Sequence, residues 1–130
     1  MVGPGFDSED DACADVALRA LKKTYAPLLV DGGALSILAA ERGRDLLRRR
    51  FECGLQTVVT PHAGEAVRLA RPFGLPTEDP SELSRLLSLA YGAIVLVKGP
   101  KSYVSDGEQI AVVSEGSAAL AKAGTGDVLA

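Results

Sequence analysis

The sequence predicts an α/β protein built on a largely parallel sheet with helices on both faces. Short apolar runs rich in β-branched residues recur along the chain, the clearest at 28–30, 57–60 and 93–97. Segments whose apolar residues follow helical spacing separate these runs. Parallel strands that are covered on both faces have such unbroken apolar runs. With 130 residues, of which 47% are hydrophobic, the chain corresponds to one globular domain at most.

The first half of the chain is predicted to alternate strands and helices from its first residues. Residues 1–5 have the pattern of a strand end followed by a glycine turn. Ser8 is then expected to cap a helix, with Asp11 as the acidic third residue of a capping box. The next elements are a strand, two helical segments and a second strand, at 28–31, 34–40, 46–51 and 57–60.

The second half contains the strongest helix start in the sequence. Asp79 suits the N-cap, Pro80 the first helical position and Glu82 the third. The other predicted elements are a helix, a buried strand and the two strands of a hairpin, at 65–71, 93–98, 102–105 and 109–113.

Charge and composition exclude several classes of function. A net charge of −3 leaves no basic field that would capture nucleic acid. The basic cluster Arg48-Arg49-Arg50 is expected to be a solvated helix face. The apolar run 93–97 is too short to cross a bilayer, and the first residues lack the pattern of a signal peptide. We therefore expect a cytoplasmic protein without a membrane partner.

Cysteine and histidine contents limit the metal and redox chemistry that can be expected. Cys13 and Cys53 form no CxxC pair, so we expect two reduced, buried thiols and neither a disulfide framework nor a zinc site. His62 is the single histidine, so a multi-histidine metal site is excluded.

Residues with chemical potential fall at the carboxyl ends of the predicted strands. Ligands of parallel α/β sheets bind at this edge. The segments concerned are Gly3-Pro4-Gly5, Asp31, Thr60-Pro61-His62, Lys98-Gly99 and the loop Gly124-Thr125-Gly126-Asp127. The sequence therefore predicts one ligand-binding edge that collects residues from the whole chain.

The loop at 124–127 has the composition of an anion site. Gly124 and Gly126 let a ligand approach the backbone, and N–H groups that lead into a helix bind anions. Asp127 would then be a carboxylate base beside the bound anion. The alternative is a glycine turn in which Asp127 is an ordinary helix N-cap.

Each of the other candidates also has a structural alternative. Lys98 either binds phosphate or extends its charged end to solvent. Asp31 either contacts a sugar hydroxyl or a metal-bound water, or caps the turn that follows it. His62 either contacts a ligand or has a structural role, and Gly5 either admits a ligand close to the backbone or makes the turn.

In this order, these residues resemble the ADP-dependent NAD(P)H-hydrate dehydratases, whose domain is ribokinase-like. The matching pieces are Gly3-Pro4-Gly5, Asp31 before Ala34-Leu35, Thr60-Pro61-His62-Ala63-Gly64-Glu65, Lys98-Gly99 with Ser102, and Gly124-Thr125-Gly126-Asp127. The sequence GTGD also occurs in kinases of this fold, whereas TPHxGE followed by KG points to the dehydratases. The resemblance implies that residues 1–130 are a partial ribokinase-like domain, incomplete at both ends.

The resemblance implies repair of hydrated NADH and NADPH with ADP as co-substrate, giving NAD(P)H, AMP and phosphate. Asp127 would be the catalytic base, and Gly5, His62 and Asp127 would contact the hydrate. The residues implied in nucleotide binding are Lys98, Gly99, Pro100, Lys101, Ser102, Gly124, Thr125 and Gly126. Mg²⁺ is expected on the phosphates and needs few protein ligands. The family also implies a homo-oligomer.

Two alternative functions remain at this point. A small-molecule kinase of the same fold would use Asp127 and its loop to phosphorylate a vitamin-precursor alcohol, although TPHxGE counts against it. A truncated, non-catalytic remnant would keep the nucleotide-binding edge without a complete site.

Overall fold

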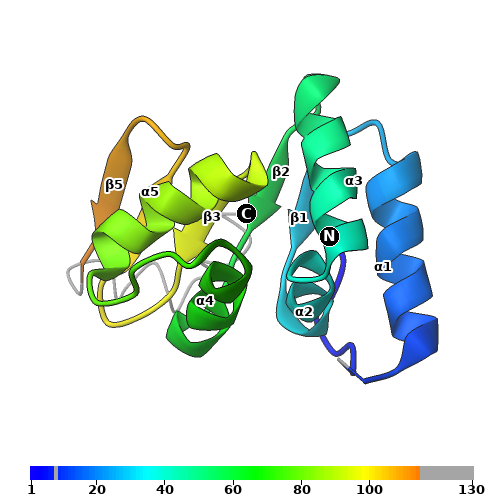
Figure 1. Cartoon of the computed structure of the whole chain (residues 1–130), viewed down its shortest axis with the longest axis horizontal. Coiled ribbons are helices and arrows are strands. Elements are labelled where there is room, and N and C mark those ends of the chain that lie inside the picture. The colour runs from blue at the N-terminus through cyan, green and yellow to red at the C-terminus, as the bar shows by residue number, and fades with distance from the viewer. Residues whose placement is uncertain (8, 115–130) are drawn as a thin grey trace.

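The computed structural model describes residues 1–7 and 9–114, so the loop at 124–127 and its Asp127 lie outside the described residues. The described residues form a five-stranded sheet in which the strand order equals the chain order (Figure 1). The strands are β1 (Leu28–Val30), β2 (Thr57–Val59), β3 (Ile94–Val97), β4 (Ser102–Ser105) and β5 (Ile110–Val113). β1, β2 and β3 are parallel, and β4 and β5 form the predicted antiparallel hairpin. The predicted α/β class and largely parallel sheet are confirmed.

The helices that accompany this sheet form one layer. They are α1 (Asp11–Lys23), α2 (Leu35–Leu38), α3 (Glu41–Glu52), α4 (Ala63–Ala70) and α5 (Pro80–Tyr91), with the short 3₁₀ turns Gly32–Ala34 and Arg71–Phe73. We expected helices on both faces, but those of the described residues cover one face (Figure 1). The reason is topological: β1, β2 and β3 follow one another across the sheet, and right-handed crossovers in one direction place their helices on the same side.

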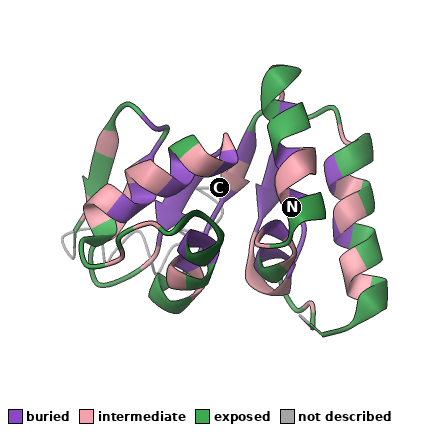
Figure 2. Ribbon diagram, viewed as in Figure 1, coloured by how far each residue is buried: buried purple, intermediate pink, exposed green. Residues whose placement is uncertain are grey.

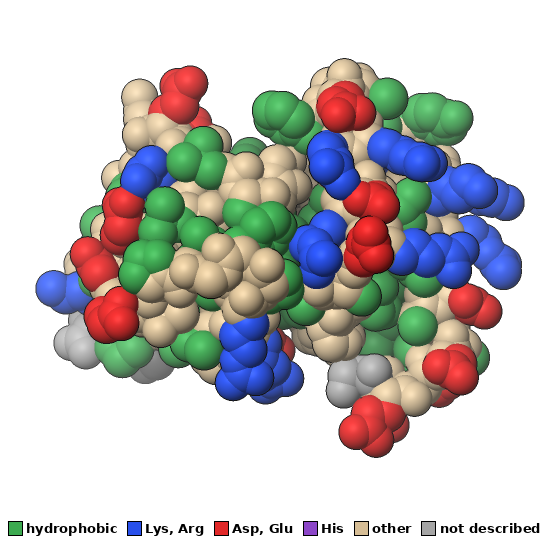
Figure 3. All heavy atoms as spheres, in the orientation of Figure 1, with side chains coloured by type: hydrophobic (Ala, Val, Ile, Leu, Met, Phe, Trp, Pro, Cys, Tyr) green, Lys and Arg blue, Asp and Glu red, His purple; other side chains and the backbone are tan. Residues whose placement is uncertain are grey.

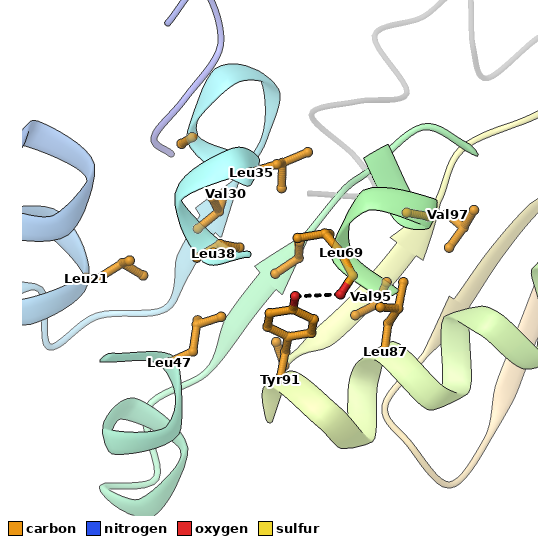
Figure 4. Close-up of a cluster of buried hydrophobic side chains, with 14 of the residues drawn as sticks. Leu21, Val30, Leu35, Leu38, Leu47, Leu69, Leu87, Tyr91, Val95 and Val97 are labelled. Atoms are coloured by element: carbon orange, nitrogen blue, oxygen red, sulfur yellow. Dashed lines mark hydrogen bonds between the residues drawn. The ribbon is translucent and has the colours of Figure 1, made fainter. Parts of the chain in front are cut away.

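The hydrophobic core lies between this helix layer and the sheet. Figure 2 shows the buried residues along the strands and on the inward sides of the helices. Val30, Val59 and Val95 occupy matching positions of the three parallel strands and belong to one cluster with side chains from all five helices. Figure 4 shows that the cluster includes Leu47 of α3 and Leu87 of α5. The core is therefore continuous across the molecule.

A buried tyrosine closes the core between α4 and α5. The Tyr91 hydroxyl donates a hydrogen bond of 2.6 Å to the carbonyl oxygen of Leu69 (Figure 4). Burial raises the pKa of Tyr91 to about 12. The hydroxyl therefore stays protonated and keeps its partner.

Helix starts agree with the sequence patterns in one case and differ in another. The Asp79 side chain accepts a hydrogen bond of 3.0 Å from the Ser81 N–H, as predicted for α5. The prediction of Ser8 as the cap of α1 is wrong, because the helix begins at Asp11 and its N-cap is Asp10. The Asp10 carboxylate accepts a hydrogen bond of 2.8 Å from the Ala12 N–H. Asp and Ser are near-equal caps, so spacing alone did not choose between them.

Arg50 corrects the prediction that the arginine cluster is a solvated face. Arg48 and Arg49 are exposed, but Arg50 is 3% exposed. Its Nε donates to the hydroxyl of Thr57 at 2.8 Å. Its terminal nitrogens donate to the carbonyl oxygens of Thr24, Ala26 and Gln56. Burial lowers the pKa of Arg50 from its usual value, and these acceptors hold the charge inside the fold.

Two smaller observations complete the fold. Both cysteines are free, as predicted, but Cys53 is exposed and Cys13 is only partly buried, because each lies near a helix end. None of the helices in the described part of the chain has the length and apolarity that crossing a membrane requires.

Candidate functional site

The candidate site is assembled by backbone hydrogen bonds between neighbouring strand ends. The Thr60 N–H donates to the Val30 carbonyl oxygen at 3.2 Å, and the Lys98 N–H donates to the Pro61 carbonyl oxygen at 2.8 Å. His62 and Lys98 form an isolated parallel bridge beyond the named strands. The ends of β1, β2 and β3 therefore meet at one edge, as the sequence predicts.

Lys98 and Asp31 form an ion pair across this edge. The Lys98 Nζ lies 3.0 Å from the Asp31 Oδ1, although the two residues are 67 positions apart in the chain. Burial raises the pKa of Asp31, but hydrogen bonds from Lys98, Gly32 and Thr60 and the Lys98 charge outweigh it. The net result is a pKa below the usual value of Asp. The pair fixes an ammonium group at the strand ends.

His62 is the N-cap of α4. The N–H groups of Gly64 and Glu65 donate to its Nδ1 at 3.0 and 3.3 Å. The Glu65 Oε2 accepts a hydrogen bond of 2.8 Å from the His62 N–H, which completes a capping box. The His62 side chain nevertheless remains 55% exposed. The capping role thus leaves the ring accessible.

The two glycines of the N-terminal turn differ in their surroundings. Both have positive φ, 116° at Gly3 and 76° at Gly5. A Cβ on Gly3 would lie 1.7 Å from the Asp31 carbonyl oxygen, so Gly3 is required by backbone packing. Among residues 1–7 and 9–114, no heavy atom lies within 4 Å of a Cβ placed on Gly5. Gly5 is therefore the glycine of this turn that borders open space.

The turn at 99–101 connects β3 to β4. The Ser102 hydroxyl and the Gly99 backbone exchange hydrogen bonds of 3.4 Å in both directions, which closes the turn. Gly99, Pro100 and Lys101 are exposed. Lys98, just before the turn, and Lys101, within it, thus provide two cations next to accessible backbone.

Sequence reasoning singled out the segments of Gly3, Thr60 and Glu65 but did not assign these residues the contacts that they make here. Glu65 completes the cap of His62, the Thr60 side chain helps to lower the pKa of Asp31, and Gly3 lets the Asp31 carbonyl oxygen approach the backbone. The spacing of Glu65 three positions after His62 was a signal for the first, because it is the spacing of a capping box. Asp31, His62, Lys98 and Gly5 are brought to one edge, whereas residues 124–127 lie outside the described residues.

The described residues offer little to a metal ion. Residues 1–7 and 9–114 contain no group of three or more His, Cys, Asp or Glu side chains that could hold one. The Asp31 carboxylate is already engaged by Lys98.

A separate hollow of about 990 Å³ lies between α3 and α5 (Figure 3). Its floor includes Thr57 and Ile94, which begin β2 and β3. The hollow is thus at the amino ends of the strands, and the candidate site is at their carboxyl ends. The site residues that the sequence predicts within the described part of the chain lie at the carboxyl ends, and none of them lines the hollow.

Comparison with known proteins identifies relatives of the chain. The NAD(P)H-hydrate dehydratase family model matches residues 1–130. A bifunctional NAD(P)H-hydrate repair enzyme of Mycobacterium leprae is 39% identical over 130 residues, covering 99% of this chain and 26% of the relative. An ATP-dependent (S)-NAD(P)H-hydrate dehydratase of Phaeosphaeria nodorum is 34% identical, covering 99% of the chain and 39% of the relative.

A third relative is the ADP-dependent (S)-NAD(P)H-hydrate dehydratase of Neisseria meningitidis, 32% identical over 131 residues and 43% covered by this chain. The chain thus spans between about a quarter and two fifths of the length of these curated relatives. The five-stranded, mostly parallel sheet is consistent with a ribokinase-like fold. Since the family model covers every residue, the chain belongs to the NAD(P)H-hydrate dehydratase family.

Proposed function

We propose that the chain forms part of an enzyme that dehydrates hydrated NADH and NADPH at the expense of ADP. The observation that carries the proposal is the convergence of Lys98, His62 and the Gly5 turn at one sheet edge. The cation suits the phosphates of a nucleotide. The ring and the open backbone suit a nicotinamide-derived ring. Residues 1–130 would be a portion of a larger ribokinase-like domain.

Nucleotide binding is proposed for Lys98 and the turn that follows it. The Lys98 ammonium group is held by Asp31, and the Lys98 side chain remains 42% exposed, so it is accessible to a phosphate oxygen. Exposed Gly99, Pro100 and Lys101 would lie along the nucleotide, with Ser102 closing the turn. A charge-assisted hydrogen bond from a fixed ammonium group binds phosphate more strongly than one from a free lysine.

Hydrate binding is proposed for Gly5 and His62. Gly5 borders open space, and His62 presents an exposed ring beside Lys98. The hydrate would thus lie across the ends of β1 and β2, with its reacting hydroxyl near the nucleotide.

The chemical step is proposed for the loop of Gly124, Thr125, Gly126 and Asp127. Asp127 takes the proton of the hydrate hydroxyl, whose oxygen attacks the β-phosphorus of ADP, and AMP leaves as that phosphorus–oxygen bond breaks. The loop N–H groups would stabilise the charge on the transferred phosphoryl group. The phosphorylated carbon then loses phosphate as the ring nitrogen forms a C=N bond, and loss of a ring proton gives NAD(P)H.

Further expectations from the family remain proposals. Mg²⁺ would be held by the phosphates, and no step is assigned to it. We also propose a homo-oligomer and a cytoplasmic location; the free state of Cys13 and Cys53 suits a reducing compartment.

The test is turnover of hydrated NADH by the full-length protein with ADP and, separately, with ATP. Return of NADH absorbance with one phosphate released per NADH supports the proposal. Asp127→Asn should abolish turnover while nucleotide affinity is kept, and retained turnover would exclude Asp127 as the base. Formation of a stable phosphorylated alcohol from ATP, without NADH, would instead identify a kinase.

Binding of ADP provides the second measurement, with two lysines compared. Lys98→Met should weaken ADP binding by about tenfold or more, because a positioned charge-assisted hydrogen bond is lost. Lys101→Met, which removes an exposed cation from the same turn, should have a smaller effect. Equal effects would mean that general charge, and not the position fixed by Asp31, determines the affinity.

A further inference from the structure

The His62 ring is exposed, yet its Nδ1 is hydrogen-bonded and its Nε2 lies near a carboxylate. Nδ1 accepts hydrogen bonds from the Gly64 and Glu65 N–H groups at 3.0 and 3.3 Å. Nε2 lies 3.3 Å from the Glu65 Oε1, and the other Glu65 oxygen accepts from the His62 N–H at 2.8 Å. Glu65 thus contacts the backbone and approaches the ring of the same residue.

These contacts determine where the ring carries its proton. A nitrogen that accepts hydrogen bonds from two N–H groups has no proton of its own. The proton of the neutral ring is therefore on Nε2, next to the Glu65 carboxylate. Nδ1 is therefore not available to accept a proton from a ligand.

Glu65 is well placed to act through His62. Its side chain is 18% exposed, compared with 55% for His62, so Glu65 is more shielded and the ring is more accessible. The backbone of His62 is in turn bridged to that of Lys98. A displacement of Glu65 would therefore release the ring without removing any group that a ligand must touch.

We propose that Glu65 is a positioning residue that holds His62 as an Nε2-protonated ring, and that His62 meets the hydrate through its ring face. This inference rests on the proposed function for the identity of the ligand. The ring face suits a planar or partly unsaturated heterocycle and its carboxamide, which the hydrated nicotinamide provides. Lys98, bridged to the same residue, would take an anionic group of the neighbouring nucleotide.

The first experiment measures the ring nitrogens of His62 directly. His62 is the only histidine among the 130 residues, so its ¹⁵N resonances in this chain are unambiguous. In the neutral ring we expect a protonated Nε2 and an unprotonated Nδ1. Glu65→Ala removes the acceptor of the His62 N–H, so the ring can leave the cap and a mixture of tautomers should result. Glu65→Gln keeps an acceptor for that N–H and should restore the single tautomer. A ring protonated at Nδ1 in the unaltered chain, or unaffected by Glu65→Ala, would overturn the proposal.

The second experiment separates the ring from the cap in the full-length protein. His62→Asn keeps a good N-cap but removes the ring, and His62→Phe keeps an aromatic face but removes both nitrogens. We expect KM for the hydrate to rise about tenfold in His62→Asn and less than threefold in His62→Phe, with kcat little changed in both. Loss of kcat in His62→Phe to the level of an inactive enzyme would overturn the proposal, because the nitrogens would then be chemically required.

The Glu65 variants test its positioning role, and a variant of Asp79, the cap of the distant helix α5, is the control. Glu65→Ala should raise KM for the hydrate, and Glu65→Gln should restore most of the affinity. Asp79→Ala removes a cap of α5, so it controls for a weakened helix start and should leave KM unchanged. If the unaltered protein does not turn over the hydrate, the proposed function fails, and the His62 tautomer still decides whether Glu65 positions the ring.

Discussion

Asp31 and Lys98 show how one pair of side chains links the fold to the candidate site. β2 lies between β1 and β3 in the sheet, so the pair spans a strand. The side chains are 28% and 42% exposed, which places the pair between a surface ion pair and a buried one. Its stability contribution should therefore be modest, and its main effect is to fix the direction of the Lys98 ammonium group.

Replacing Asp31 by Asn should lower the free energy of unfolding by about 0.5–1 kcal/mol at neutral pH. The pKa of Asp31 is lower in the folded protein than its usual value, so its contribution is complete above the unfolded pKa. The contribution is then lost as the pH falls through the folded pKa. The difference between Asp31→Asn and the unaltered chain should therefore shrink below about pH 4, as measured by urea unfolding. A difference of equal size on both sides of that pH would contradict the prediction.

Arg50 is the residue whose surroundings depart most from its sequence context. It ends an arginine cluster, yet it donates to three carbonyl oxygens in the segments before β1 and β2 and to the hydroxyl of the first residue of β2. These segments contain the turns that lead into the two strands. Arg50 therefore replaces the hydrogen bonds that regular structure would supply there.

Arg50→Met should destabilise the protein by about 2–4 kcal/mol, because it removes four hydrogen bonds, one buried and three part-buried, while keeping much of the side-chain volume. Arg49→Met changes an exposed neighbour of the same helix and should cost less than about 0.5 kcal/mol. Chemical unfolding of both variants measures the contrast. Similar losses in the two would mean that the carbonyl contacts of Arg50 contribute little.

At the scale of elements, a prediction from the sequence was accurate where the contacts that determine the element lie between nearby residues. The start of α5 was predicted correctly, since Asp79, Pro80 and Glu82 carry the whole signal within four positions. The start of α1 was missed by two residues, because several acids and Ser8 compete for one cap. The strand ends were placed together correctly because parallel strands share one carboxyl edge.

Contacts between distant elements could not be read from the sequence. The Lys98–Asp31 pair and the contact of Arg50 with Ala26 join positions 67 and 24 residues apart. No periodicity reports which carbonyl oxygen an arginine will reach. The role of Glu65 was locally encoded, but histidine is an uncommon cap and the pattern was not assigned to it.

The caps of α1 and α5 give a matched test at this scale. Asp10→Ala and Asp79→Ala should each lower the free energy of unfolding by about 1 kcal/mol, because each leaves an N–H of the first turn without its acceptor. Asp10→Asn and Asp79→Asn should recover most of the loss, since asparagine caps equally well. Chemical unfolding of the four variants checks both statements. A loss in the asparagine variants as large as in the alanine variants would indicate charge, not capping, as the cause.

At the scale of the whole molecule, the described part of the chain has a cleft on its surface and a continuous core beneath. The hollow between α3 and α5 lies between two halves of the fold (Figure 3). One half contains α1, α2 and α3, and the other contains α4 and α5. Below it, Leu47 and Leu87 belong to the same buried cluster. Sequence periodicity identified both helices, but the one-sided helix layer followed from strand order, which depends on pairing between distant segments.

The continuous core predicts that the two halves unfold together. Leu47 and Leu87 are both 0% exposed, so truncation to alanine should cost about 2–5 kcal/mol at either site. Because one cluster joins the halves, each substitution should shift the transition of the whole chain. Far-ultraviolet circular dichroism reports the helices, and near-ultraviolet circular dichroism reports the tyrosines, of which Tyr91 is buried at the centre. The two signals should have the same midpoint in the unaltered chain and should move together in Leu47→Ala and in Leu87→Ala. If Leu47→Ala shifted the far-ultraviolet transition and left the tyrosine transition in place, the halves would be separate folding units, and the cleft between α3 and α5 would be a boundary between them.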